Sequence, residues 1–121
     1  MLKNMAMVFG VVFLLIGVLG FVPGITTEEG LLLGIFQVSA IHNIIHILSG
    51  VAALAGAMSN QYAKLYFKVF GLVYGLVTVV GFIQGDTVLG LIDVNLADNL
   101  LHAAIAVAAL SLGFGVKSDV E

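Results

Sequence analysis

The sequence contains no cysteine and no tryptophan, and only 9% of its residues are charged. Without cysteine the chain can form no disulfide, no thiolate metal site and no cysteine nucleophile. Ordinary soluble domains carry about a quarter of charged residues. A soluble fold of 121 residues could not hide a composition that is 61% hydrophobic, because small domains leave a large share of their surface exposed. These shortages indicate a single domain whose solvent is a lipid bilayer.

Four apolar segments have the length of a membrane-spanning helix, for which about 20 residues cross roughly 30 Å of hydrocarbon. We expect spans over residues 5–22, 41–58, 63–83 and 97–116. The first segment resembles a cleaved signal peptide in that Lys3 precedes it, but no Ala-x-Ala cleavage pattern follows, so we expect it to be retained. The sequence therefore predicts an all-α, four-helix membrane bundle that forms one domain over residues 1–121.

Two shorter apolar stretches precede the second and fourth spans. Residues 30–40 and 88–96 are too short to cross a bilayer, and glycine interrupts both. We expect them to lie at the membrane interface or to re-enter the membrane. Re-entry requires cover from the other helices, because unpaired backbone groups are costly in lipid.

Basic and acidic residues occupy opposite ends of the predicted spans. The basic residues lie at the two termini and in the turn between the second and third spans: Lys3, Lys64, Lys68 and Lys117. Acidic residues lie in or next to the two longer loops: Glu28, Glu29, Asp86, Asp93 and Asp98. The positive-inside rule then places both termini in the cytoplasm and both longer loops outside. We expect a multi-pass protein of the cell's inner (cytoplasmic) membrane.

The two halves of the chain repeat each other. Gly20-Phe21 recurs as Gly81-Phe82 at an offset of 61 residues, and the Asn-x-x-His of residues 43–46 recurs in residues 99–102 at an offset of 56. Each half has two predicted spans and begins on the same side of the membrane. The repeats are therefore parallel, related by an axis along the membrane normal. They cover about residues 5–58 and 63–116 and predict a pseudo-two-fold bundle.

Polar, titratable side chains enter the long apolar runs only around the two Asn-x-x-His motifs. Asn43 and His46 open the second span, and Asn99 and His102 open the fourth. An Asn and a His three residues apart share one face of a helix. Small residues recur along the second, third and fourth spans and allow helix backbones to approach closely. If the second and fourth spans meet at the axis, the two motifs face each other.

Three stretches carry a likeness to a known family. They are Gly20-Phe-Val-Pro-Gly24, residues 33–50 with His42-Asn-Ile-Ile-His46, and residues 94–102 with Asp98-Asn-Leu-Leu-His102. On these stretches the chain resembles small four-span prokaryotic membrane proteins catalogued as domain of unknown function 4383. The chain departs from the pattern at Ala106, which matches Gly50 of the first half, and at Ser39-Ala40, where the family suggests Asn-Pro. The resemblance implies a fold and carries no established biochemical role.

His46 and His102 allow several interpretations. As packing groups, each would donate a hydrogen bond to a backbone carbonyl or an Asn of a neighbouring helix, a latch worth about 0.6 kcal/mol. As ligands, the pair would hold haem b axially, or one of them would ligate a chlorin. With His42 they would form a three-nitrogen site for Zn or Cu. A proton or ion path is the fourth interpretation. Alanines around His102 leave little room for a macrocycle, which favours the latch.

Asp98 matches His42 at the offset of 56 residues. A carboxylate here could orient an imidazole that binds a metal. A cap at the start of the fourth span explains it better, because free amides at a helix start favour a nearby carboxylate. The same interpretation applies to His42 or Ser39 in the first half. We therefore expect Asn43, Asn99 and Asp98 to be structural polar residues.

No motif indicates an enzyme. The sequence has no Gly-rich phosphate loop, nucleophile–base arrangement or metalloprotease motif, and its four lysines are too scattered to bind nucleic acid. We expect no catalytic residue. The leading hypothesis is a structural or accessory membrane subunit, in a homo-oligomer or a larger complex. The alternatives are a cofactor-binding, electron-transfer module ligated by His46 and His102, and an oligomeric small channel or transporter.

Overall fold

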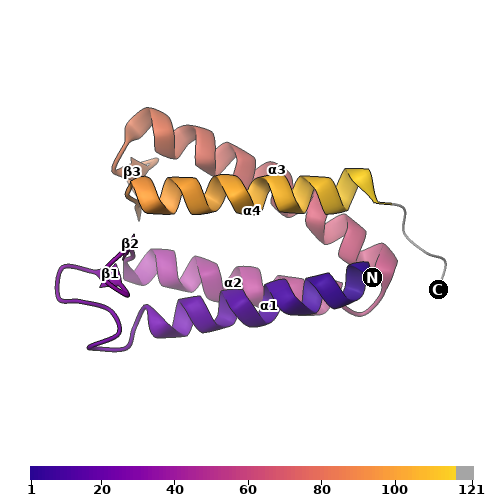
Figure 1. Cartoon of the computed structure of the whole chain (residues 1–121), viewed down its shortest axis with the longest axis horizontal. Helices are drawn as coiled ribbons and strands as arrows, with labels where there is room; N and C mark the ends of the chain where they lie inside the picture. The colour runs from indigo at the N-terminus through magenta and orange to yellow at the C-terminus, as the bar shows by residue number, and fades with distance from the viewer. Residues whose placement is uncertain (117–121) are drawn as a thin grey trace.

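The computed structural model describes residues 1–116, which form two antiparallel helix pairs with a small hairpin at the same end of each pair (Figure 1). The first pair contains α1 (Leu2–Leu19), β1 (Leu31–Leu32), β2 (Phe36–Gln37) and α2 (Ala40–Gly56). The second contains α3 (Asn60–Gln84), β3 (Thr87–Val88), β4 (Ile92–Asp93) and α4 (Leu96–Gly115). The expected all-α class is confirmed. Lys117, assigned above to the basic end, lies outside the described residues.

Three helices, α1, α3 and α4, are long and apolar enough to cross a membrane. The remaining helix, α2, is also apolar but has only 17 residues. It begins where the side chain of Ser39 accepts a hydrogen bond from the backbone N–H of His42, and it ends before the short turn into α3. Large apolar side chains such as Leu15, Leu48 and Leu76 are exposed on the outside of the helices. An apolar outer surface is what a lipid environment requires of a small helical bundle.

The two segments expected at the membrane interface form β-hairpins. β1 pairs antiparallel with β2, and β3 pairs antiparallel with β4. Both hairpins turn at the same dipeptide, Leu33-Gly34 in the first and Leu89-Gly90 in the second, with positive φ at each residue. The hairpins pair backbone groups that an irregular segment would leave open. Apolar composition alone could not reveal this, because it does not distinguish a short strand from an irregular piece.

The closest helix packing lies within each pair, at glycines. A Cβ added to Gly10 on α1 would meet the carbonyl oxygen of Gly50 on α2 at 3.1 Å, and a Cβ on Gly50 would meet that of Gly10 at 2.9 Å. In the other pair, a Cβ on Gly113 of α4 would meet the backbone nitrogen of Lys68 on α3 at 2.7 Å. The small residues therefore join α1 to α2 and α3 to α4, and the second and fourth helices do not form the main contact.

The two asparagines also face their own pair. Asn99 Nδ2 donates to the carbonyl oxygen of Gly81 on α3 at 3.2 Å, and a Cβ on Gly81 would collide with Asn99 Oδ1. Asn43 packs in the same way against Gly20, at the end of α1. The expectation that both Asn-x-x-His motifs meet across the axis is thus wrong for the asparagines. Residues three apart are roughly 60° apart around a helix, so the Asn can face its partner helix while the His faces the centre.

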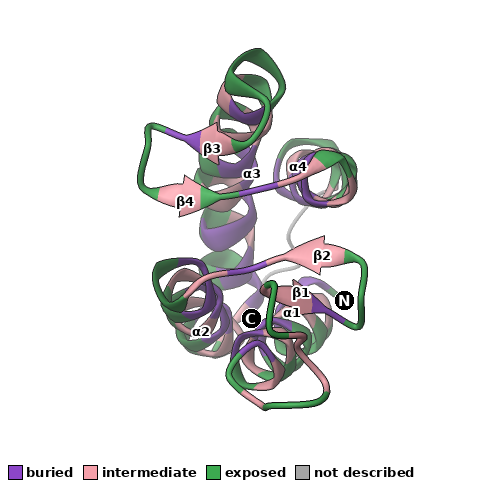
Figure 2. Cartoon of the chain, turned by 90° about the vertical axis from the view of Figure 1, so that its left-hand side faces the viewer, coloured by how far each residue is buried: buried purple, intermediate pink, exposed green. Residues whose placement is uncertain are grey.

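The hairpins join the two pairs at one end of the bundle. β2 of the first pair contacts α4 of the second, and β4 of the second contacts α2 of the first (Figure 2). Asn95, just before α4, donates through Nδ2 to the carbonyl oxygen of Ile35 at 2.9 Å. Each hairpin thereby covers the start of a helix from the other pair.

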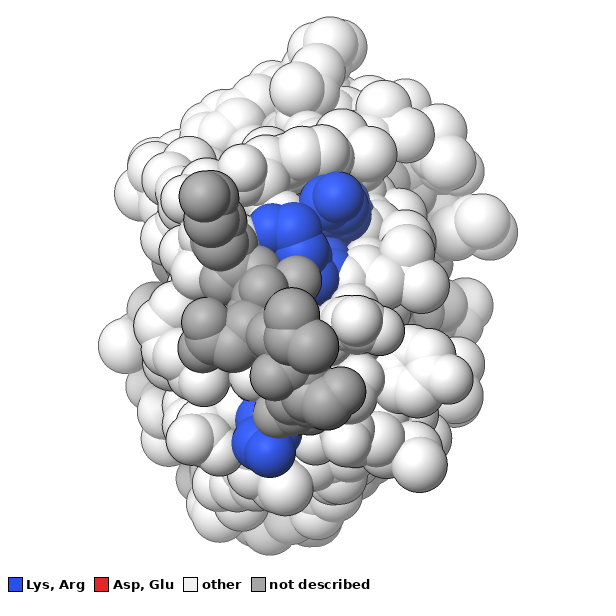
Figure 3. Space-filling view, turned by 90° about the vertical axis from the view of Figure 1, so that its right-hand side faces the viewer, with Lys and Arg blue, Asp and Glu red and all other residues white. Residues whose placement is uncertain are grey.

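Lysines lie at the opposite end of the bundle. Figure 3 shows this end, with lysine side chains and no acidic side chain visible among the described residues. Lys3 belongs to the first turn of α1, and Lys64 and Lys68 to the first turns of α3. Lys64 Nζ donates to the backbone carbonyl of Val116. A long lysine stem of this kind can lie along apolar surface while its charge stays near water.

Two glycines of α3 provide a matched test of this packing. We expect Gly81→Ala to lower the free energy of unfolding by about 1–3 kcal/mol, because the added methyl collides with Asn99. Gly75→Ala should raise it by up to about 1 kcal/mol, because a Cβ on Gly75 meets nothing within 4 Å and alanine favours a helix. Unfolding of both variants in the same detergent measures the difference. Equal stabilities would show that Asn99 does not pack against Gly81.

Candidate functional site

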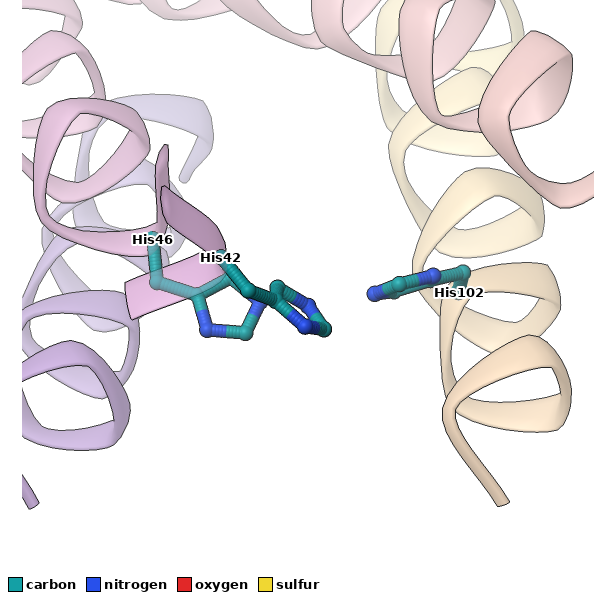
Figure 4. Close-up of side chains that lie close together, drawn as sticks. All are labelled: His42, His46 and His102. Carbon is teal, nitrogen blue, oxygen red and sulfur yellow. The ribbon is translucent and has the colours of Figure 1, made fainter. Parts of the chain in front are cut away.

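Three imidazole rings meet between the two helix pairs (Figure 4). His42 and His46 come from the first turns of α2, and His102 reaches toward them from α4. Their ring centroids are separated by 4.4 Å (His42–His46), 5.6 Å (His42–His102) and 6.3 Å (His46–His102). One ring nitrogen of each residue lies within 4.8 Å of the other two, and all three side chains are buried. We refer to these three residues as the histidine triad.

A backbone carbonyl orients the ring of His42. Its Nδ1 lies 3.0 Å from the carbonyl oxygen of Asp93 on β4. A carbonyl oxygen only accepts, so Nδ1 carries the proton and Nε2 keeps a free lone pair. That Nε2 is buried and has no hydrogen-bond partner among residues 1–116. Metal-binding histidines are commonly held in this way, with one ring nitrogen donating to a carbonyl and the other facing the ion.

His46 and His102 lack the partners that a latch requires. Within the described part of the chain, the buried Nδ1 atom of each ring has no hydrogen-bond partner. An unpaired buried polar atom costs about 1–3 kcal/mol. The expected bonds to a carbonyl or an Asn are therefore absent at these Nδ1 atoms, and of the three histidines His42 alone has a described latch. The two asparagines, Asn43 and Asn99, do not bond these nitrogens, because both side chains face the neighbouring helix of their own pair.

Two aromatic rings lie directly against the histidine triad. Phe13 of α1 lies 5.8 Å from His46, and Tyr74 of α3 lies 5.6 Å from His102, at an interplanar angle of 89°. The hydroxyl of Tyr74 is 3.2 Å from Ser49 Oγ on α2. Neither Ser49 nor Tyr74 was predicted from the sequence as a site residue. The repeat offset of 61 residues could have indicated Tyr74, because it matches Phe13.

Two cavities flank the histidine triad. The first, about 240 Å³ in volume, lies between α2 and α3 and is lined by all three histidines, by Ser49 and Tyr74, and by apolar side chains. The second, about 230 Å³, is lined by residues of α1, the first hairpin and α4. It is apolar except for His46 and Asp98. Side chains with a hydroxyl group therefore line only the first of these two cavities.

Asp98 takes part in the cap of α4. Its Oδ2 accepts from the backbone N–H of Asn95 at 3.0 Å, and Asn95 Oδ1 accepts from the backbone N–H of Asp98 at 2.9 Å. This reciprocal pair is a capping box, in which the first residue caps the helix and the residue three positions later returns the bond. Asn95 is thus the N-cap, and Asp98 lies three positions inside it. In the first half Ser39 is the N-cap, and His42 takes the place of the carboxylate.

Comparison with known proteins matches most of the chain to one family. A family model described as "Domain of unknown function (DUF4383)" matches residues 3–115. No curated protein and no solved structure matches the chain.

The unequal bonding of the histidines has a consequence for stability. In metal-free protein kept with a chelator, we expect His42→Leu to lower the free energy of unfolding by about 1–2 kcal/mol, because it removes the hydrogen bond to Asp93. His46→Leu should leave stability unchanged or raise it, because it removes a nitrogen without a described partner. Both substitutions replace a buried ring with the same side chain. Equal losses would show that His46 has a structural partner.

Proposed function

The chain belongs to the DUF4383 family, and we propose that this member is a membrane protein that holds one transition-metal ion with His42, His46 and His102. One observation carries the proposal: three buried imidazoles from two helix pairs converge, and each has a ring nitrogen without a described hydrogen-bond partner. Leaving three such atoms inside an apolar bundle is costly. A metal ion would give one nitrogen of each ring a partner.

The donor set favours zinc or copper. Imidazole nitrogen suits Zn and Cu, and the chain has no cysteine to supply thiolate. Zn–N bonds of about 2.0–2.1 Å in a tetrahedral site place the nitrogens about 3.3 Å apart. The three nitrogens, all within 4.8 Å of one another, would have to close by up to about 1.5 Å, which side-chain rotations can supply. Three protein ligands leave the fourth position of the ion open.

Haem b and chlorin are less well supported. A macrocycle between His46 and His102 would have to displace the ring of His42, which lies within 5.6 Å of both. The cavities of about 240 and 230 Å³ are also smaller than the roughly 300–1,000 Å³ typical of sites for drug-sized ligands. The accessory-subunit hypothesis gives no reason for three buried imidazoles to converge.

The proposed setting is the inner (cytoplasmic) membrane, with α2 as a fourth span. Its 17 residues measure about 26 Å, and a span that is slightly short can be accommodated by local thinning of the bilayer. The end of the bundle that carries the lysines would face the cytoplasm, and the hairpins would lie on the opposite, non-cytoplasmic side of the membrane. The same elements follow in the same order in each pair, which supports the parallel repeat over residues 5–58 and 63–116.

Metal loading tests the proposed function directly. Detergent-purified protein, stripped with EDTA and reloaded with Zn²⁺, should hold one ion per chain by elemental analysis. Its melting temperature should rise, because an ion that binds only the folded state stabilises it. We expect His46→Leu and His102→Leu each to weaken Zn²⁺ binding by about 100-fold, or about 2.7 kcal/mol.

Asp93→Asn is the matched control for metal loading. It removes a carboxylate near the site and keeps the backbone carbonyl that orients His42, so Zn²⁺ binding should persist. Equal Zn²⁺ binding by wild type and a variant lacking all three histidines would contradict the proposal.

The absence of cysteine allows a direct test of orientation. Glu28, in the α1–β1 loop, and Gln61, in the first turn of α3, are both exposed. In intact spheroplasts, a membrane-impermeant maleimide should label Glu28→Cys but not Gln61→Cys, because the positive-inside rule places the lysine end in the cytoplasm. Permeabilised spheroplasts, in which both variants should react, provide the control. Labelling of Gln61→Cys alone before permeabilisation would reverse the proposed orientation.

A further inference from the structure

We propose that the cavity between α2 and α3 binds a lipid-soluble aromatic alcohol, of the quinol or phenol class, at the open side of the histidine triad. This inference rests on the proposed metal site and deepens it. The ring of the ligand would occupy the cavity, and its oxygen would take the open position on the metal ion.

The cavity opens on an apolar surface. Two of its lining residues, Leu48 of α2 and Val73 of α3, are 62% and 48% exposed on the outside of the bundle. In the proposed membrane setting this surface faces lipid. A ligand that enters between the two helices must therefore partition into the bilayer and be apolar over most of its surface.

The polar side chains that line the cavity could donate a hydrogen bond to an oxygen atom of a ligand. Besides the histidine triad, its polar lining consists of the hydroxyls of Ser49 and Tyr74, which are 3.2 Å apart. Two hydroxyls carry two protons, and a bond between them uses only one. The other has no acceptor among residues 1–116 and can donate to an oxygen of the ligand. The fourth position of a three-histidine zinc site also takes oxygen.

The size and walls of the cavity suit a single aromatic ring. An apolar cavity of about 150 Å³ is large enough to hold benzene. The cavity here is about 240 Å³, which leaves room for a ring with small substituents. The side chains of Phe70 and Tyr74 and the imidazoles line it, and aromatic rings pack favourably edge to face or offset.

The other half of the chain lacks the two hydroxyls. Phe13 matches Tyr74 at the offset of 61 residues, and Ile105 matches Ser49 at the offset of 56. Both replacements are packed against the core of the same bundle. Packing therefore does not require a hydroxyl at either position. The polar pair is present only beside the cavity that all three histidines line, which is the placement expected of ligand-binding groups.

Calorimetry with a defined probe tests the inference. The probe is 2,3,5-trimethyl-1,4-hydroquinone, titrated into detergent-solubilised, Zn²⁺-loaded protein; zinc has no redox chemistry, so only binding is measured. We expect one probe per chain. Ser49→Ala and Tyr74→Phe should each weaken binding about tenfold while the zinc content, measured on the same samples, stays unchanged. The 1,4-dimethoxy analogue, which has no O–H, should bind at least about tenfold more weakly.

A matched pair of cavity-filling variants provides the structural control. Val77→Phe adds a ring to the proposed cavity, and Ile16→Phe adds one at the matching position of the second cavity. Only Val77→Phe should abolish probe binding. Equal effects of the two variants, equal binding of the dimethoxy analogue, or equal binding by zinc-free protein would each overturn the inference. If zinc-loaded protein does not bind the probe, the inference is overturned but the proposed metal site is not. If the wild type holds no zinc, both the inference and the proposed metal site are overturned.

Discussion

Close backbone contact within each helix pair is the constraint on which the rest of the structure depends. Gly10 and Gly50 let α1 lie against α2, and Gly113 lets α4 lie against α3. In lipid no hydrophobic force drives helices together, so such close van der Waals contact is the main source of association. Each pair closes on itself, and the asparagines point into these contacts. The space between the pairs is thereby left to other side chains.

The buried histidines lie in the space between the two helix pairs. The hairpins bridge the pairs at one end, and one of them supplies the Asp93 carbonyl that orients His42. His46 and His102 complete the cluster with buried nitrogens that no described group satisfies. Proteins tend to break local rules of this kind at functional sites and compensate elsewhere. Here the tight helix pairs supply the compensation, and the histidine triad is the exception that a bound ion would explain.

The two halves share a scaffold but not a set of functional groups. Each half has a helix, a hairpin and a second helix in the same order, and each hairpin turns at a Leu-Gly dipeptide with positive φ. The side chains at the centre differ: His42 matches Asp98, and Tyr74 matches Phe13. Two halves with the same order of elements can therefore carry different side chains at the centre of the bundle. In the proposed repeat, symmetry fixes where the rings meet, and these differences place two hydroxyls beside one cavity and none beside the other.

Composition and local pattern determined much of this protein. The apolar runs predicted the helices, and the placement of the lysines predicted that basic residues gather at one end of the bundle. The Asn-x-x-His motifs marked two of the three histidines that converge. Each of these properties depends on neighbours along the chain and on the solvent. The hairpins, the cap at Asn95 and the different neighbours of Asn43 and His46 were missed, because backbone pairing and helix rotation are set by contacts between segments. Only the tertiary structure decided that α2 pairs with α1, that three imidazoles share one space, and that Ser49 and Tyr74 lie beside them. Those contacts join residues dozens of positions apart, and no local pattern specifies which helix faces fit together.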